Sequence, residues 1–284
     1  MALLSSASPP IITLRSRFHL RNPNPNSLNS RLHSSALQRR AQRFRFRSQF
    51  AGVAASNICE QETLTLDRGS LIVKEYFTEA ELLAAVRLRI RTFYEFNQET
   101  FNVEDHRRFL TEREYEALKD RVCGMRIGFK RVTCINATLP LSPVLVSASD
   151  LCSLCKFSDD GENRVVVGTL DLNQCLSLTD ELTGKKPQGT GPDLKRAYLS
   201  NVCVAKELQR NGLGYALIAK SKEVAREWGI TDLYVHVAVD NDAAQKLYEK
   251  SGFVYENEEP AWQARFLSRP RRYLLWTHLK QTNL

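Results

Sequence analysis

Apolar positions along the chain switch between two spacings, and these switches mark the expected strands and helices. An apolar run at 71–76 predicts a first strand. Thr78 followed by Glu81 forms a capping box, and apolar residues then recur at helical spacing as far as Phe93. The heavily charged segment 104–121 predicts a second helix, with most of its charges on a solvated face. The pattern therefore indicates one strand and two helices in this part.

The middle of the chain predicts strands joined by irregular segments. Residues 124–149 contain two prolines and two β-rich runs, which indicates a strand and an insert. The runs 150–157 and 164–173 flank a polar turn and predict a β-hairpin. Residues 179–193 are rich in Gly and Pro and predict a loop before the next strand.

The apolar run 198–204 predicts a strand that leads through two glycines into a helix ending near Gly229. The following run, 233–239, is apolar on both faces, as in a strand inside a sheet. A short helix is expected from 240–242 to Gly252.

Two final strands are predicted at 253–255 and 273–278. The loop between them, 260–270, carries unusual apolar weight, including Trp262 and Phe266.

The net charge of +8 is confined to the start of the chain. Residues 1–59 contain nine of the 40 basic residues, all Arg, and no acidic residue. The rest holds 31 basic and 32 acidic residues, so charge gives no reason to expect a nucleic-acid partner. This leader is rich in Ser and Arg and has no long apolar core, as in an organelle transit peptide.

We expect a disordered transit peptide at 1–55 and a short linker at 56–69. The sequence near Val53–Ser56 resembles plastid processing sites, which favours the chloroplast stroma. A mitochondrial presequence is the alternative because Arg is dense at 39–47, and an RNA-binding arm is a third interpretation. No segment is apolar and long enough to span a membrane.

The seven cysteines are odd in number and accompany no secretory signal, which indicates free thiols in a reducing compartment. Cys152 and Cys155 have zinc-ligand spacing but lack a second pair or a nearby His. We therefore expect buried small hydrophobic residues and no metal site.

The segment 209–214 carries the first chemical signal. It has the pattern Gln-x-x-Gly-x-Gly and lies between a strand and a helix. Glycines allow a ligand to approach the backbone, and the free N–H groups of a helix start favour anions. The segment is neither a Walker loop nor a Gly-x-Gly-x-x-Gly fingerprint. Alone, it does not distinguish a phosphate site from a tight turn.

Two further motifs follow it in order: Asn241-x-x-Ala244-x-x-Leu247-Tyr248 and Lys250-Ser251-Gly252-Phe253. Together the three motifs resemble the GNAT superfamily of acyl-CoA-dependent N-acetyltransferases. The resemblance implies an α+β (α/β/α) domain at 70–284, with inserts near 124–149 and 179–193. It also implies a mixed sheet of about six to seven strands, splayed around acetyl-CoA and flanked by about four helices.

The resemblance further implies which residues hold acetyl-CoA as co-substrate. We call residues 209–215 the cradle. The pyrophosphate is expected on backbone N–H groups of residues 210–215, and the pantetheine arm is expected to pair with the backbone of Val202 and Val204. The expected cofactor-binding residues are Val202, Cys203, Val204, Gln209, Arg210, Asn211, Gly212, Leu213, Gly214, Tyr215, Asn241, Asp242, Ala243 and Tyr248.

By the same resemblance, three residues are expected to be catalytic. Tyr248 matches the tyrosine that protonates the departing CoA thiolate, although a packed helix tyrosine is the alternative. The family's Glu base is absent from 198–204. Instead His236, with Tyr198 on the preceding strand, resembles a pattern found in protein N-terminal acetyltransferases. A free His has a pKa of ~6.5 and can take a proton near neutral pH, but a lone strand His is often only a core residue.

The resulting hypothesis is acetylation of protein N-terminal α-amines, with lysine ε-amines as further acceptors, in the plastid. The loop 260–270 is expected to form one wall of the acceptor groove. A small arylalkylamine acetyltransferase of the serotonin type is the alternative function. A non-catalytic acyl-CoA-binding regulator is the third, although it leaves Tyr248 unexplained. The sequence does not indicate an oligomeric state.

Overall fold

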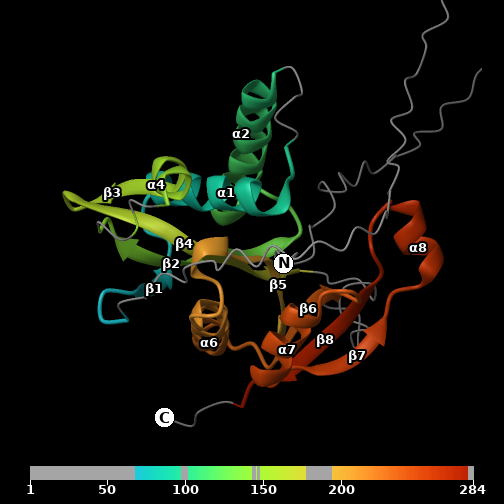
Figure 1. Ribbon diagram of the computed structural model, residues 1–284. Helices are drawn as coiled ribbons and strands as arrows, with labels where there is room; N and C mark the ends of the chain where they lie inside the picture. The colour runs from blue at the N-terminus through green and yellow to red at the C-terminus, as the bar shows by residue number, and fades with distance from the viewer. Residues whose placement is uncertain (1–67, 97–101, 143–144, 146–147, 177–193, 281–284) are drawn as a thin grey trace, which may run out of the picture. The chain divides into compact units, whose positions relative to one another are not determined.

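A computed structural model describes residues 68–96, 102–142, 145, 148–176 and 194–280 (Figure 1). The strands are β1 (Ile72–Glu75), β2 (Phe129–Pro140), β3 (Lys156–Asp159), β4 (Glu162–Cys175), β5 (Arg196–Val204), β6 (Asp232–Ala238), β7 (Val254–Glu258) and β8 (Arg272–His278). The helices are α1 (Glu79–Phe93), α2 (Val103–Val122), α4 (Ser149–Cys155), α6 (Leu213–Glu227), α7 (Asp242–Lys250) and α8 (Ala261–Phe266), with a 3-10 turn, η1, at Lys206–Leu208. The expected transit peptide, most of the linker and the loop 179–193 lie outside the described residues.

The strands form one mixed sheet in the order β1-β2-β4-β5-β6-β8-β7, and β3 pairs with β4 beside this path. The pairing of β5 with β6 is parallel, and the other strand pairs are antiparallel. The fold is thus α+β and its sheet is mixed, as expected. Its eight described strands exceed the expected six to seven because β3 adds a short strand.

Helices α1, α2 and α4 cover one face of the sheet and α6 covers the other (Figure 1). This double cover explains why β4 is buried on both faces over its last twelve residues. The core is continuous from α1 through β4 and β5 to α6. It holds the centre of the sheet rigid, so that loops following the central strands have fixed starting points.

The start of α1 follows the predicted capping box, with one change. The N–H of Glu81 donates to Oγ1 of Thr78 at 3.1 Å, as expected. The carboxylate of Glu81 accepts from the N–H of Phe77 rather than from the cap residue itself. Its other oxygen accepts from Nδ2 of Asn136 on β2 at 2.9 Å. Glu81 therefore caps the helix and also ties it to the sheet.

The prediction of a strand over 150–157 was wrong for most of its length. Residues Ser149–Cys155 form α4, and the hairpin is limited to β3 and the start of β4. Leu151, Cys152 and Cys155 are all buried, and their spacing places them on one face of a helix. The negative charge of Asp150 in the first turn also stabilises the helix by interacting with the positive end of its dipole. Burial of this apolar face outweighs the β tendency of the run.

The loop predicted at 260–270 contains α8. Pro260 precedes its first turn, where a missing N–H costs nothing. Trp262 and Phe266 are 64% and 81% exposed and lie four residues apart, so they share one face of the helix. The apolar weight noted in the sequence thus lies on the surface.

Candidate active site

The candidate site begins where β5 and β6 separate. Their register pairs run only from Arg196 with Asp232 to Leu199 with Val235. Beyond Leu199 the backbone of β5 has no partner on β6 among the described pairs, although β4 still pairs with its other edge. The two central strands therefore stop pairing before their carboxyl ends, and we call the place where they separate the gap.

The cradle leads from β5 into α6. Arg210 and Gly212 both have left-handed backbone, with φ values of 68° and 82°. Gly212 is the N-cap of α6, and no side chain caps the helix there. The first N–H groups of α6 thus keep no side-chain acceptor at the N-cap, which leaves them to a ligand or solvent.

The two cradle glycines are required for different reasons. A side chain on Gly212 would meet open space near the Arg68 guanidinium, so its positive φ is the reason for glycine. A Cβ on Gly214 would lie 2.9 Å from Cδ2 of Leu247. Gly214 therefore allows α6 to pack closely on α7. The sequence interpretation gave both glycines the same task, close approach of a phosphate.

A cavity of about 290 Å³ lies at the cradle. It is lined by Val204, Leu208, Gln209, Arg210, Gly212, Leu213, Gly214, Tyr215, Ala243, Lys246, Leu247 and Lys250. Three of these residues are cationic: Arg210, Lys246 and Lys250. Free helix N–H groups together with three cations suit the phosphates of a CoA-type nucleotide. The residues present fit that group.

Side-chain amides hold the loop in place. Nδ2 of Asn211 donates to the carbonyls of Leu208 and Gln209, each at 3.3 Å. Nε2 of Gln209 donates to the carbonyl of Val204 at 3.4 Å. These bonds link the loop to the end of β5, so Asn211 acts inside the cradle wall rather than on its cavity.

Tyr198 and His236 lie side by side where β5 and β6 part. The phenol oxygen of Tyr198 is 2.9 Å from Nδ1 of His236, and the ring centroids are 5.6 Å apart. His236 is only 4% exposed, whereas Tyr198 is half-buried. Of the pair, Tyr198 is thus the group more open to an incoming molecule.

Burial raises the pKa of the Tyr198 phenol, and the guanidinium groups of Arg272 and Arg269 offset part of that rise. Both arginines bind the buried carboxylate of Glu259, which forms a two-oxygen pair with Arg269 and lies 3.5 Å from Nη2 of Arg272. The phenol therefore stays protonated at neutral pH and can donate or accept a hydrogen bond at His236.

Tyr248 lies on α7 and is 2% exposed. Its ring packs edge-on against Phe253, with centroids 5.6 Å apart. Asn241 caps the same helix, since its Oδ1 accepts from the N–H of Ala244 at 3.1 Å. Both residues thus have structural roles, and the structure does not place either on the cradle cavity.

Of the predicted cofactor-binding residues, eight line the cavity: Val204, Gln209, Arg210, Gly212, Leu213, Gly214, Tyr215 and Ala243. The others lie beside it in the wall or in the strand and helix that frame it: Val202, Cys203, Asn211, Asn241, Asp242 and Tyr248.

Sequence reasoning missed Lys246 and Lys250. Lys246 and Lys250 lie four residues apart on the helix that carries Tyr248, so the sequence could have indicated that both lie on one face of that helix. Arg68 had no signal, because only the fold brings it near Gly212.

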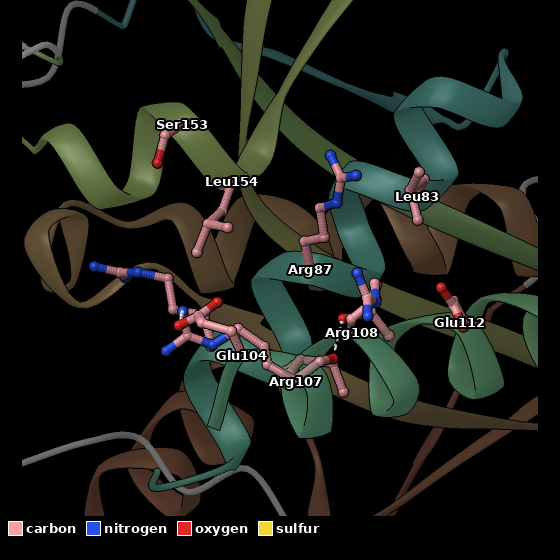
Figure 2. Close-up of a pocket in the computed structure, with 11 residues that line it drawn as sticks. Leu83, Arg87, Glu104, Arg107, Arg108, Glu112, Ser153 and Leu154 are labelled. Carbon is pink, nitrogen blue, oxygen red and sulfur yellow. Dashed lines mark hydrogen bonds and ion pairs between the residues drawn. The ribbon is translucent and has the colours of Figure 1, made fainter. Parts of the chain in front are cut away.

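A second hollow, of about 470 Å³, lies between α1, α2 and α4 (Figure 2). Its arginines are largely matched by carboxylates: Arg91 binds Asp150 and Glu207, and Arg107 binds Glu104. No predicted site residue lines it. Arg91 thus links α1 to α4 and to η1, whereas the pair of Arg107 with Glu104 lies within α2.

Within the described part of the chain, no helix is long and apolar enough to cross a bilayer. In the same residues, no three His, Cys, Asp or Glu side chains are grouped so that they could hold a metal ion.

Comparisons with known proteins identify the family of this chain. The model of the Acetyltransferase (GNAT) family matches residues 137–253, which include β4, β5, the cradle and α7. "GCN5-related N-acetyltransferase 7, chloroplastic" of Arabidopsis thaliana is 62% identical over 226 residues, covering 80% of this chain and 81% of that protein. "GCN5-related N-acetyltransferase 6, chloroplastic" of the same plant is 29% identical over 194 residues, covering 65% of this chain and 62% of that protein.

A crystal structure of the PaiA N-acetyltransferase from Thermoplasma acidophilum in complex with coenzyme A is 12% identical. The match covers 74% of this chain and 99% of that chain, with a TM-score of 0.44. The family assignment depends on the similarity to the 62% identical relative and on the family-model match. The chain belongs to the GNAT family of acetyltransferases.

Proposed function

We propose that this protein uses acetyl-CoA to acetylate protein N-terminal α-amines, and also lysine ε-amines, in the plastid. The observation that carries the proposal is the Tyr198–His236 pair, 2.9 Å apart at the point where β5 and β6 separate. An amine that attacks a thioester must first lose a proton. A phenol bonded to an imidazole can take that proton and pass it on.

The cradle supports acetyl-CoA as the acetyl donor. Its free N–H groups and the cations Arg210, Lys246 and Lys250 would hold the phosphates. Bound there, acetyl-CoA supplies an activated acetyl group. The unpaired edge of β5 at Val202 and Val204 would orient the pantetheine arm by backbone hydrogen bonds, as a neighbouring strand does.

Tyr248 would supply the proton that the CoA sulfur needs on leaving. Its helix starts beside the cradle and its neighbours Lys246 and Leu247 line the cavity. Free thiol and phenol have pKa values of ~8.5 and ~10, so proton transfer from a phenol to a thiolate needs only a modest change of environment. Its packing against Phe253 would fix the direction of the phenol.

The acceptor class rests on α8. This helix lies in the segment that connects β7 to β8, and the ion pair of Glu259 with Arg269 joins the two ends of that segment. The chain then continues to Arg272, whose positive charge offsets part of the rise that burial causes in the pKa of the Tyr198 phenol. The exposed rings of Trp262 and Phe266 offer flat apolar contacts to an extended peptide. An exposed aromatic face on the helix that precedes Arg269 and Arg272 suits a polypeptide end.

Plastid location is supported by two independent observations. The 62% and 29% identical relatives are named chloroplastic, which favours the plastid over the mitochondrion. The first 59 residues contain nine Arg and no acidic residue, a composition typical of transit peptides.

The test is incubation of the purified protein with acetyl-CoA, a peptide library and a panel of arylalkylamines. Mass spectrometry would score acetylation at α- and ε-amines, with His236→Gln as the matched control. We expect peptide α-amines to be modified, and the variant to lose this activity. Turnover of arylalkylamines alone would overturn the acceptor class. CoA binding without turnover of any amine would overturn the enzyme proposal.

A further inference from the structure

Strand β5 contains a bulge next to the gap. Across β4 and β5, Thr169 pairs with Cys203 but Asp171 pairs with Ser200. On β4 one residue lies between Thr169 and Asp171, whereas on β5 two residues lie between Ser200 and Cys203. Strand β5 therefore carries one extra residue there. Within the bulge Asn201 has a φ of 56°, a left-handed value that few residues other than glycine adopt.

The side chain of Asn201 is bound to a buried carboxylate. Its Nδ2 donates to Oδ2 of Asp171 at 2.8 Å. Asp171 is fully buried and accepts from Arg89 through both of its oxygens, at 2.6 and 3.0 Å. Nη2 of Arg121, on α2, lies 3.5 Å from the same carboxylate. We name Asn201, Asp171 and Arg89 the bulge clamp.

The clamp is fixed from several elements. Nη2 of Arg89, on α1, also donates to Oγ1 of Thr169 at 2.8 Å. Burial by itself would lower the pKa of Arg89, but the Asp171 charge reverses this and the pKa is raised. The guanidinium is thus permanently charged and holds Asp171 in one position. Because Arg89 binds both oxygens of Asp171, the carboxylate cannot turn away from Asn201 without breaking this buried ion pair.

The location of the bulge connects it with the reaction. The last register pair of β5 and β6 is Leu199 with Val235, two residues before Asn201. Tyr198 lies one residue earlier still and contacts His236. The bulge is therefore the first stretch of β5 backbone that faces the open gap. A change of φ at Asn201 would redirect the following backbone groups.

We propose that Asn201 is a positioning residue: held by Asp171, it sets the direction of the β5 backbone beyond Leu199, which would donate to the thioester carbonyl of acetyl-CoA bound in the gap. The residue touches no reactant itself and acts through the conformation of the bulge. The inference depends on the proposed binding of acetyl-CoA in the gap, but it does not depend on the proposed acceptor.

The first test uses the conformational preference of glycine. Asn201→Ala loses the bond to Asp171 and disfavours positive φ, whereas Asn201→Gly loses the bond but accepts that φ. We expect the alanine variant to lower kcat about tenfold or more with KM for acetyl-CoA nearly unchanged, and the glycine variant to recover most of it.

The matched control is Asn102→Ala. Asn102 also has a left-handed φ, 64°, but lies at the start of α2, and its side chain forms no cap hydrogen bond. The control should lower thermal stability without changing kcat. Equal losses of kcat in Asn201→Ala and Asn201→Gly, or full activity of Asn201→Ala, would overturn the proposal.

The second test needs no acceptor. Acetyl-CoA labelled with ¹³C at the thioester carbonyl would be bound to the full chain and its resonance recorded. Hydrogen bonding to the carbonyl oxygen should move this resonance downfield from its free position. We expect Asn201→Ala to lose the displacement and Asn201→Gly to keep it. Identical resonances in all variants would contradict the clamp's role, even if peptides are not the acceptors.

Discussion

The phenol oxygen of Tyr198 lies 2.9 Å from Nδ1 of His236, at the point where two parallel strands end their pairing. Because His236 is 4% exposed, an amine in the gap would meet the half-buried Tyr198 first. The phenol oxygen would accept the proton of the amine while its own proton moves to Nδ1. The two side chains would then form a single relay.

The relay makes the effects of the two residues non-additive. His236→Gln and Tyr198→Phe should each lower kcat/KM about 100-fold, in the range of general acid–base catalysis. The double variant should fall no further than the worse single variant, within about threefold. Steady-state kinetics on one peptide measures this. Multiplied losses would show that the residues act separately.

The pH dependence separates the roles of the pair. Burial raises the pKa of Tyr198, so the phenol remains protonated above the range where free tyrosine begins to ionise. His236→Gln should change the acid side of the pH–rate profile, because it removes the imidazole that the phenol contacts. Tyr198→Phe should leave the basic side of the profile in place. A basic limb that moves in Tyr198→Phe would contradict this assignment.

Removing the phenol of Tyr248 should impair turnover and spare binding. Tyr248→Phe keeps the ring packed against Phe253, so the fold is retained. We expect kcat to fall about 100-fold while the Kd for acetyl-CoA changes little. Tyr255→Phe, at a phenol 59% exposed on β7, is the control and should retain wild-type turnover. Unchanged kcat in Tyr248→Phe would remove the residue from the mechanism.

The cradle lysines should govern CoA affinity. Lys246→Ala combined with Lys250→Ala should raise the Kd for CoA about tenfold or more at low salt, because each ammonium group lines the cavity and would bind phosphate through a charge-assisted bond. The difference should shrink at high salt. Calorimetric titration at two ionic strengths measures both effects. Lys130→Ala on β2 should bind as the wild type, and a salt-independent loss would indicate damage to the fold instead.

Breaking the buried ion pair should destabilise the protein strongly. Arg89→Leu leaves the fully buried Asp171 without its two-bond partner, and should lower the free energy of unfolding by about 3–5 kcal/mol. Arg108→Leu removes an exposed pair with Asp105 and should cost about 1 kcal/mol or less. Denaturant unfolding measures the free energy of unfolding of both variants. Equal decreases would show that buried Asp171 does not need Arg89 as its partner.

Thiol reactivity should be confined by burial. Desolvation raises the pKa of Cys134, Cys155, Cys175 and Cys203 to about 12, so these groups are almost fully protonated at pH 8. Among the described cysteines, iodoacetamide should modify the exposed Cys123 in the native protein and the others only after unfolding. Peptide mass mapping checks this. Rapid native labelling of Cys203 would show that the gap opens.

The C-terminal elements could be predicted because local chemistry decides them. The apolar run of β6 and the short helix α7 before Gly252 each follow from neighbouring residues. The helix at Ser149–Cys155 could not be predicted in this way, because its stability depends on burial of Leu151 and Cys155 against distant strands. Short apolar runs have the same composition in helices and strands.

The candidate site divides along the same line. One resemblance identified both Tyr198 and His236, but their contact depends on a parallel register that the sequence does not state. The contact of Asn201 with Asp171 spans 30 residues and needs a bulge between β4 and β5. Such long-range polar pairs leave no signal in the neighbouring sequence, since Asn and Asp are also common in exposed turns, where they form no such pair.

The short pairing of β5 with β6 has a consequence for the lifetime of the protein. Within the described residues, four register pairs between β5 and β6 join the β1–β5 part of the sheet to β6, β8 and β7. A molecule bound in the gap with hydrogen bonds to β5 would act as an additional strand there. At 100 times its Kd such a ligand adds about 2.7 kcal/mol to the folded state. Resistance to heat and proteolysis should therefore rise with the supply of acetyl-CoA, and the amount of enzyme would follow the metabolic state of its compartment.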